Sequence, residues 1–267
     1  MRPGMIELST VSVDIGTKRI VSDVSFAAQA GEVTAIVGPN GSGKTTLLKA
    51  ISGEWAYHGS IKLAGRELRT MKLWETAGFR AVLPQATTLS FPFTVLEIVR
   101  LGLTSGRSGV SGSALELLAE EALERVDLAG FAGRFYQELS GGEQQRVQLA
   151  RVLCQVWQPV LDGQPRFLLL DEPVSSLDIK HQLVIMGIAR DFAKAGGGVI
   201  AILHDLNLTA MFADRIVMMH RGRAEAVGSP SEVLVDERIS RVFECGLRVG
   251  ITPAAGAPFV LPQSATL

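Results

Sequence analysis

The residues best suited to chemistry form a glycine-rich loop at residues 38–46, which fits the phosphate-binding pattern G-x-x-x-x-G-K-[ST]. An apolar, β-branched run at residues 33–37 precedes the loop and a helical pattern at 47–51 follows it, so the loop connects a strand to a helix. Glycines let successive backbone N–H groups face one anion, and the helix adds its positive dipole end. The residues expected to bind nucleotide phosphates here are Gly38, Pro39, Asn40, Gly41, Ser42, Gly43, Lys44, Thr45 and Thr46.

Two side chains of the loop have chemistry of their own. Lys44 is expected to contact the β- and γ-phosphates, and the Thr45 hydroxyl to bind a Mg²⁺ ion that bridges the same phosphates. The alternative is a glycine-rich turn with an exposed lysine, which a single match to the pattern does not exclude. The loop is therefore interpreted together with the motifs that follow it in the chain.

A pair of acids follows the apolar run at residues 167–170. Such a run predicts a buried parallel strand, whose carboxyl end brings Asp171 and Glu172 into the active crevice. Asp171 is expected to hold Mg²⁺, directly or through water, and Glu172 to polarise the attacking water as general base. Adjacent acids can also mark a solvated strand end, but the apolar run before them argues against this.

Polar side chains end two other predicted strands. Gln85 follows an apolar strand at residues 81–83, so its amide oxygen can ligate Mg²⁺ and orient water, although alone it would be interpreted as a solvated loop residue. His204 follows the strand at residues 198–203, and its place beside the other motifs predicts a contact with the γ-phosphate. The remaining histidines are interpreted as structural or surface residues: His58, His181 and His220.

A second anion-binding element begins at Ser140. Ser140 and Glu143 have the spacing of a capping box, and Gly141 with Gly142 leaves the first helical N–H groups uncovered by side chains. A plain helix cap needs no paired glycines, so we expect this helix end to bind an anion. Further along the chain, Asp178 follows a turn and is expected to begin or precede a helix.

Composition and charge argue against several other functions. The net charge of -1 provides no basic field, so nucleic acid is not expected as a partner. Residues 1–7 lack the apolar segment of a signal peptide and no run approaches ~20 apolar residues, which predicts a cytosolic chain. Cys154 and Cys245 lack metal-ligand spacing and are expected to be buried as small hydrophobic residues.

The rest of the sequence predicts one α/β domain with an insertion. Short strands around residues 6–30 and a hairpin at 59–66 indicate a β-layer beside the nucleotide. Residues 86–158 are expected to be mostly helical, with a helix at 114–126 and a glycine- and serine-rich surface loop at 102–112. The expected units are a nucleotide-binding core with its β-subdomain at 1–85 and 159–245, the helical subdomain at 86–158 and a C-terminal tail at 246–267.

Phe91 and Phe93 flank a proline outside any predicted regular element. They are either core residues or part of a docking surface for a hydrophobic partner, and the sequence leaves both interpretations open.

These motifs stand in the order and spacing of the ATPase subunits of ABC transporters, which the chain resembles over nearly its whole length. The resemblance implies a P-loop NTPase core with a mainly parallel sheet, an N-terminal antiparallel β-subdomain and an inserted helical subdomain that carries the signature motif. It also implies ATP hydrolysis with Mg²⁺ as the cofactor. One departure is Ile15, which stands where many nucleotide-binding proteins carry an aromatic residue that stacks on adenine, so Ile15 is not assigned to base binding.

The resemblance also implies partners. Two copies would pack head to tail, with each ATP between the Lys44 region of one chain and Ser140 with Gly142 of the other, and Asp178 would belong to the D-loop. Dimer closure would then drive transmembrane permease subunits, and indirectly a periplasmic substrate-binding protein. The chain would lie peripherally on the cytoplasmic face of the inner membrane.

Several stretches resemble the haemin importer ATPases, which belong to the branch of iron-siderophore and cobalamin importers. These stretches are residues 89–95, 156–166, 252–254 and 259–262. A ferric-siderophore or cobalamin importer is the alternative, because the transported molecule does not touch this subunit. A soluble ABC ATPase of DNA repair or translation is less favoured, because such proteins usually carry a long coiled coil or tandem cassettes, neither of which occurs in this sequence.

Overall fold

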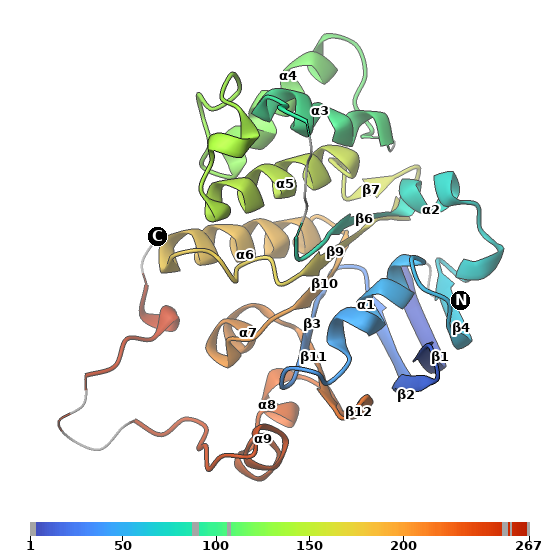
Figure 1. The fold of residues 1–267 in the computed structure, drawn as a ribbon, viewed down its shortest axis with the longest axis vertical. Helices are drawn as coiled ribbons and strands as arrows, with labels where there is room; N and C mark the ends of the chain where they lie inside the picture. The colour runs from blue at the N-terminus through green and yellow to red at the C-terminus, as the bar shows by residue number, and fades with distance from the viewer. Residues whose placement is uncertain (1–3, 87–90, 106–107, 253–255, 257, 266–267) are drawn as a thin grey trace.

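The computed structural model describes residues 4–86, 91–105, 108–252, 256 and 258–265. At its centre is a six-stranded sheet in the order β12-β11-β3-β10-β9-β6 (Figure 1). Neighbouring strands are parallel except at one edge, where β12 pairs antiparallel with β11. The strands are β3 (Val33–Val37), β6 (Arg80–Leu83), β9 (Phe167–Asp171), β10 (Gly198–Ile202), β11 (Arg215–His220) and β12 (Arg223–Gly228). This mainly parallel sheet confirms the predicted α/β core.

The central strands β3, β9 and β10 are buried at every residue, because an apolar cluster covers each face of the sheet. Parallel strands point the same way, so their carboxyl ends meet at one edge. The phosphate-binding loop follows β3, Asp171 and Glu172 lie at the end of β9, and His204 lies just beyond β10. The sheet order therefore brings motifs from distant parts of the chain together.

A second, antiparallel sheet has the order β2-β1-β4-β5. Its strands are β1 (Met5–Ile15), β2 (Lys18–Gln29), β4 (His58–Leu63) and β5 (Arg66–Glu67). The expectation of several short strands was wrong, because bulges with register shifts, such as the one between Leu8 and Val11, let β1 and β2 continue as two long strands. The apolar side chains of this sheet pack with α1 (Lys44–Ser52) against the central sheet.

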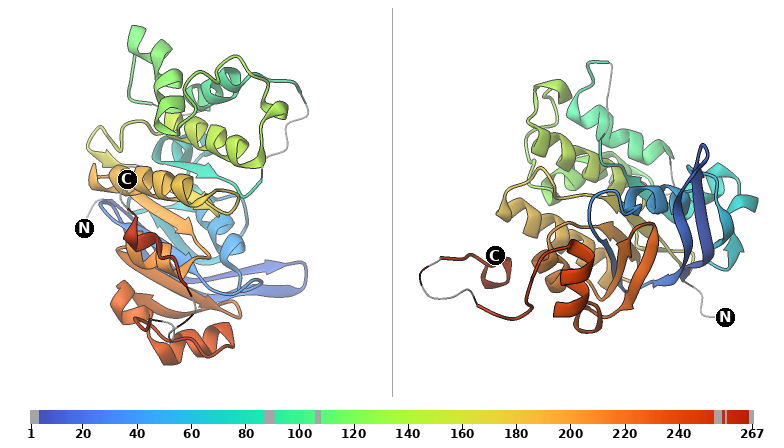
Figure 2. Two further views of the ribbon diagram at one scale, coloured as in Figure 1. Left: turned by 90° about the vertical axis from the view of Figure 1, so that its left-hand side faces the viewer. Right: turned by 60° about the horizontal axis from the view of Figure 1, so that its bottom comes forward.

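Three helices lie between β6 and β9 in the sequence: α3 (Val95–Ser105), α4 (Ser113–Arg125) and α5 (Gly141–Gln155). Figures 1 and 2 show them together at one end of the molecule, beyond α6 (Ile179–Lys194). The predicted helical insertion is present, whereas its bounds at residues 86 and 158 stay predictions.

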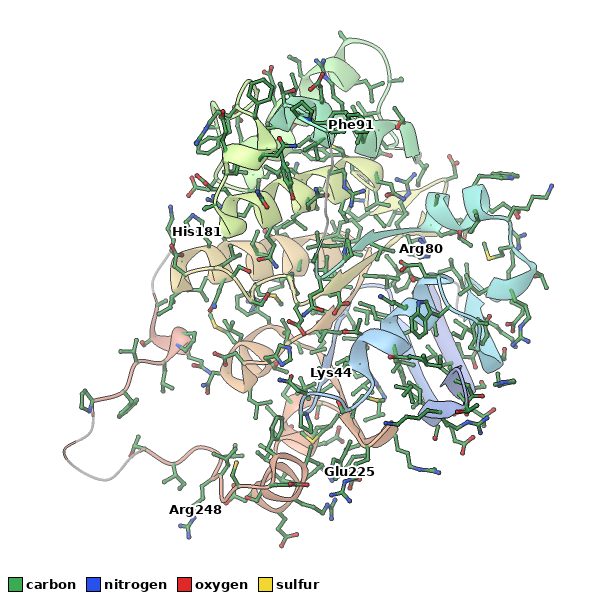
Figure 3. All side chains as sticks on the ribbon, viewed as in Figure 1. Lys44, Arg80, Phe91, His181, Glu225 and Arg248 are labelled. Atoms are coloured by element: carbon green, nitrogen blue, oxygen red, sulfur yellow. The ribbon has the colours of Figure 1, made fainter. Side chains whose placement is uncertain are left out.

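The structure separates the two phenylalanines that the sequence could not distinguish. The Phe91 side chain lies on the helical insertion and is 70% exposed (Figure 3). Phe93 is half-buried and packs against the apolar core, and the two rings make an edge-to-face contact. Phe93 is therefore a core residue, and only Phe91 is available to a partner.

Helix α3 extends into the stretch that the sequence predicted to be a surface loop. Gly102 lies inside α3, so the prediction was wrong up to Ser105, and residues 106 and 107 lie outside the described part of the chain. A Cβ at Gly102 would lie 2.0 Å from the carbonyl oxygen of Arg151 in α5. This glycine therefore serves close helix packing, a role that local sequence does not distinguish from that of a loop glycine.

We expect Gly102→Ala to lower the free energy of unfolding by about 1–3 kcal/mol, because the added methyl group forces α3 away from α5. Gly187→Ala in α6 is the matched control, since a Cβ there has open space around it and should stabilise the helix by roughly 0.5–1 kcal/mol. Urea denaturation measures both variants. Equal stabilisation by the two alanines would contradict the close approach of α3 and α5.

The other elements complete the fold. They are α2 (Leu73–Phe79), α7 (Leu206–Phe212), α8 (Pro230–Val233), α9 (Asp236–Phe243), a hairpin of β7 (Val160–Leu161) with β8 (Gln164–Pro165), and 3₁₀ turns at Leu68–Thr70, Tyr136–Glu138 and Pro262–Ser264. Residues 89, 90, 253 and 254, part of the resemblance to haemin importers, lie outside the described residues. Across the described helices, none has both the length and the apolar character that crossing a bilayer demands.

The two cysteines differ in their surroundings. Cys154 is buried in α5 as expected, and burial raises the pKa of its thiol to about 12. Cys245 is exposed, so its expected burial was wrong. The reason is local: α9 ends at Phe243, and Glu244 with a φ of 55° turns the chain away from the core.

Candidate nucleotide-binding site

The phosphate-binding loop has the conformation that its glycines permit. Gly38, Gly41 and Gly43 have φ angles of 144°, 77° and 98°. A Cβ at Gly38 would lie 2.1 Å from the carbonyl oxygen of Met219, so only glycine fits there. Helix α1 begins directly after Gly43, and its N-terminus therefore points its free N–H groups into the loop.

Lys44 is a buried cation within this loop (Figure 3). Its Nζ atom donates hydrogen bonds to the carbonyl oxygens of Gly38, at 2.9 Å, and Pro39, at 3.0 Å. Burial lowers the pKa of Lys44, and the negative charges of Glu172 and Asp171 partly oppose that effect. The two carbonyl groups solvate the buried ammonium group less well than water would. An anion beside Nζ would therefore form a strong charge-assisted hydrogen bond with it.

Thr45 and Asp171 form a pair of oxygen donors beside the loop. The Thr45 hydroxyl donates a hydrogen bond to Asp171 Oδ1 at 3.2 Å. Burial raises the pKa of Asp171, and the Thr45 hydrogen bond offsets part of that effect. A cation near Asp171 would stabilise the charged carboxylate, which burial disfavours. A hydroxyl oxygen and a carboxylate oxygen together are ligands suited to Mg²⁺.

Glu172 and His204 are in direct contact. Glu172 Oε1 lies 2.7 Å from His204 Nε2, and the Glu172 side chain is mostly buried while His204 is partly exposed. Glu172 has a φ of 52°, a left-handed conformation that is uncommon for a residue with a side chain. The carboxylate and the imidazole come from neighbouring strands, β9 and β10, which hold both groups at the same sheet edge.

These groups share one cavity of about 730 Å³. Of the residues that the sequence singled out, it brings together Asn40, Gly41, Gly43, Lys44, Thr45, Thr46, Gln85, Glu172 and His204. Asp171 does not line it but reaches it through Thr45. The lining residues are Ile15, Lys18, Ile20, Asn40, Gly41, Gly43, Lys44, Thr45, Thr46, Gln85, Glu172 and His204.

Lys18 and Ile20 also line this cavity, although they were not predicted as site residues from the sequence. They lie at the start of β2, and no motif marks them, because their place depends on how the antiparallel sheet folds over the loop. Ile15, at the end of β1, is also at the cavity and is 42% exposed. An aliphatic wall formed by Ile15 and Ile20 is compatible with covering a flat ring.

Two other loop residues face away from this cavity. Pro39 and Ser42 line a smaller cavity of about 280 Å³ together with His220 and Arg221. The Ser42 hydroxyl is buried there with no hydrogen-bond partner among the described residues. Residues of the loop therefore line two different cavities.

The second anion-binding element has the predicted capping box. The Glu143 backbone N–H donates to Ser140 Oγ at 3.3 Å, and Glu143 Oε2 accepts from the Ser140 N–H at 2.8 Å and from its hydroxyl at 2.7 Å. These hydrogen bonds hold the pKa of Glu143 below its usual value. Ser140, Gly141, Gly142 and Glu143 line a cavity of about 430 Å³ that shares no residue with the cavity at Lys44. Within one chain, the Ser140 helix start and the loop at Lys44 therefore line separate cavities.

Asp178 lies at the edge of the same cavity and begins α6, as predicted. It accepts a hydrogen bond from the His181 N–H at 2.9 Å, and its Oδ1 lies 2.8 Å from His181 Nδ1. His181 Nε2 also lies 3.4 Å from Asp127 Oδ2, so this histidine connects the start of α6 to the segment that follows α4 in the helical insertion. It was expected to be structural, and these contacts are consistent with that.

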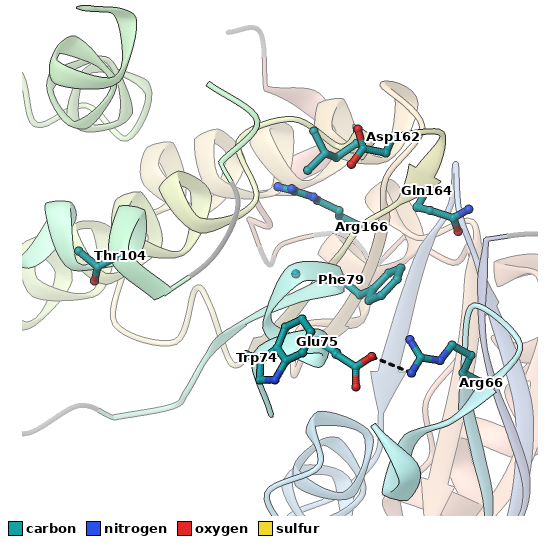
Figure 4. A pocket seen from close by; sticks show the side chains of 10 residues that line it. Arg66, Trp74, Glu75, Phe79, Thr104, Asp162, Gln164 and Arg166 are labelled. Carbon is teal, nitrogen blue, oxygen red and sulfur yellow. Dashed lines mark hydrogen bonds and ion pairs between the residues drawn. The ribbon is translucent and has the colours of Figure 1, made fainter. Parts of the chain in front are cut away.

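Another cavity, of about 360 Å³, lies between α2, the end of α3 and the β7-β8 hairpin (Figure 4). Arg66 and Glu75 form an ion pair at 2.8 Å on one side, and Trp74 is 68% exposed beside it. None of the predicted site residues lines this cavity.

The loop between β3 and α1, with carboxylates at the end of β9, which is separated from β3 by β10, defines a nucleotide-binding protein of the P-loop class. The ABC transporter family matches residues 21–175, and the chain belongs to this family.

Curated relatives match almost the entire chain. The hemin import ATP-binding protein HmuV of Mesorhizobium japonicum is 71% identical over 97% of this chain and 99% of its own length. The protein of the same name from Rhizobium johnstonii is 63% identical over 98% of each chain.

Solved structures show the same fold. A structure of a dimeric bacterial ABC transporter cassette is 28% identical, with a TM-score of 0.72, and the match covers 84% of this chain and 98% of that one. An ATP-binding subunit of an ABC transporter has a TM-score of 0.75 at 24% identity, over 91% of this chain and 94% of that one. At that identity the second likeness shows the fold alone.

Proposed function

We propose that this chain is the ATP-binding and ATP-hydrolysing subunit of an ABC importer that energises haemin uptake across the inner membrane. The similarity to proteins named hemin import ATP-binding protein, at 71% and 63% identity over almost the entire chain, carries this proposal. The cavity that joins Lys44, Glu172 and His204 supports ATP hydrolysis as the source of energy.

Growth of a strain lacking this chain tests the substrate. With haem, a ferric siderophore or inorganic iron as the sole iron source, we expect loss of growth on haem alone, and recovery when the chain is restored. Normal growth on haem with failure on the siderophore would assign the chain to a siderophore importer. Growth on all three would make cobalamin uptake the next candidate.

ATP phosphates bind along the phosphate-binding loop, where the free N–H groups of α1 and the ammonium of Lys44 supply positive charge. Thr45, Asp171 and Gln85 would hold Mg²⁺, which neutralises charge on the β- and γ-phosphates when bound. Within the described ranges, His, Cys, Asp and Glu side chains form no cluster of three or more that could bind a metal. Mg²⁺ in phosphate-binding sites is usually held by one or two carboxylates together with water and phosphate oxygens, and the oxygens of Thr45, Asp171 and Gln85 suit such a site.

Glu172 acts as the general base. Its carboxylate accepts a proton from the attacking water, which increases the electron density on the water oxygen as it approaches the γ-phosphate. His204, whose Nε2 lies 2.7 Å from the carboxylate, orients Glu172 and contacts the γ-phosphate. Gln85, which lines the same cavity, orients the same water.

Hydrolysis needs a second copy of the chain, packed head to tail. Ser140, Gly141, Gly142 and Glu143 of one copy, with Asp178 of its D-loop, would close over the ATP that the other copy holds at Lys44. Two observations support this: the elements occupy separate cavities in one chain, and a related cassette is described as dimeric.

Ser140→Arg should block ATP-dependent dimerisation while leaving ATP binding to one chain intact, because the longer cationic side chain fills the space needed by the other copy's γ-phosphate. The dimer is measured by sedimentation with ATP, and each variant also carries Glu172→Gln, because slow hydrolysis preserves the bound nucleotide. Ser113→Arg, at the exposed start of α4, is the control and should dimerise normally. A normal dimer of the Ser140 variant would refute the shared site.

The chain lies on the cytoplasmic face of the inner membrane, bound to permease subunits, and serves a periplasmic substrate-binding protein indirectly. The exposed Phe91 side chain is a candidate for the permease contact, because burial of a large aromatic group there would favour association. Phe91→Ser should lower haem-dependent growth several-fold and leave the ATPase activity of the isolated protein unchanged. Normal growth would exclude this residue from the contact.

A further inference from the structure

The backbone of Glu172 is held in its left-handed conformation by a side chain from the helical insertion. The Glu172 carbonyl oxygen accepts a hydrogen bond from Gln145 Nε2 at 2.7 Å. The Ser175 hydroxyl and N–H also donate to it, at longer distances of 3.2 and 3.4 Å. The shortest bond therefore comes from α5, a helix 27 residues away in the sequence.

The amide of Gln145 makes this contact at a cost. Its Oε1 atom is buried and has no hydrogen-bond partner among the described residues. The neighbouring Gln144 differs, because its amide donates to the carbonyl oxygens of Tyr136 and Leu139 within the insertion itself. A buried polar atom without a partner is uncommon, and here the same side chain reaches the backbone of the reacting residue.

Helix α5 begins immediately after Ser140, and Gln145 lies two residues beyond Glu143, on the same helix as the signature residues Ser140, Gly141, Gly142 and Glu143. A displacement of the signature end would move Gln145 with it. Glu172 in turn contacts His204 through its carboxylate. A continuous series of hydrogen bonds and contacts thus runs from α5 through the Glu172 backbone to the two groups that face the cavity.

The geometry points to Gln145 as a positioning residue that couples the orientation of the signature helix to the carboxylate of Glu172. This inference rests on the proposed role of Glu172 as general base. Gln145 does not touch the reacting atoms; it holds the peptide unit after Glu172, and so sets the direction of the side chain. When α5 occupies another position, this hydrogen bond weakens and the carboxylate loses its alignment.

The test compares Gln145→Met, which keeps the side-chain length and removes the donor, with the wild-type chain. We expect kcat for ATP to fall roughly ten- to a hundredfold while the Kd for ATP changes less than about twofold, because small misplacements of a reacting group have effects of this size. Gln145→Glu is a nearly isosteric second variant, also without a donor, and should show the same loss. An unchanged kcat in both variants would overturn the inference.

Gln155→Met is the matched control. Gln155 lies at the far end of α5 and also donates to backbone carbonyl oxygens of the core, those of Ala77 and Arg80. Gln155→Met should lower the free energy of unfolding about as much as Gln145→Met does, but it should leave kcat unchanged. An equal fall of kcat in this variant would mean that Gln145 acts only through general helix packing.

A double mutant separates this inference from the proposed function. In the Glu172→Gln background, Gln145→Met should cause no further loss of single-turnover rate, because the group that it positions is already inactive. If the double mutant instead lost single-turnover rate by the product of the two separate factors, the inference would be overturned and the role of Glu172 would stand. Normal turnover of Glu172→Gln alone would instead overturn the general-base proposal.

Discussion

Glu172→Gln should bind ATP normally and turn it over at least ~10²-fold more slowly than the wild-type chain. The amide has the size and shape of the carboxylate and can still accept a hydrogen bond from His204, so the cavity keeps its form. It cannot accept the proton of the attacking water. Phosphate release gives kcat, and titration with a non-hydrolysable ATP analogue gives the Kd.

Glu121→Gln is the control for this experiment. Glu121 lies on the exposed face of α4, where it pairs with Arg125 at 3.2 Å, far in the sequence from any residue of the cavity. Its turnover should equal that of the wild-type chain. Unchanged turnover of the Glu172 variant would remove the general-base role.

Lys44→Ala should lose nucleotide binding, turnover or both, with kcat/KM lowered by at least about 10²–10³-fold, the effect typical of removing a preorganised donor to a charged group. The variant removes the cation that is proposed to bind the phosphates. It also removes the hydrogen bonds to the carbonyl oxygens of Gly38 and Pro39, which help to hold the loop. ATP titration and steady-state kinetics measure the two effects separately.

Lys62→Ala provides the comparison, because Lys62 is an exposed lysine of β4 and does not line the nucleotide cavity. It should bind and hydrolyse ATP like the wild-type chain. If Lys44→Ala behaved in the same way, the interpretation of residues 38–46 as the phosphate-binding loop would be wrong.

Local signals predicted the elements that carry most of the candidate site. The apolar run before Asp171 and Glu172 predicted a buried strand, and its burial at every residue confirms this. The spacing of Ser140 and Glu143 predicted a capping box, which the structure contains. These predictions succeed because strand burial and helix capping depend on residues close together in the chain.

Predictions that depended on packing were less successful. Gly102 was placed in a loop, whereas it lets α3 approach α5 closely. Cys245 was expected in the core and is exposed. Phe91 and Phe93 could not be distinguished until the fold half-buried Phe93 against the core and exposed Phe91. In each case residue type is compatible with several environments, and only the neighbours in space select among them.

The sequence by itself determined the class of chemistry: a loop for phosphates, carboxylates at a strand end and a helix N-terminus for a second anion. The tertiary structure decided which groups meet. It placed His204 against Glu172, added Lys18 and Ile20 to the cavity, and brought Gln145 to the Glu172 backbone. Such contacts follow from the strand order and from how helices pack on the sheet, and no local pattern encodes them, because the two partners lie far apart in the chain.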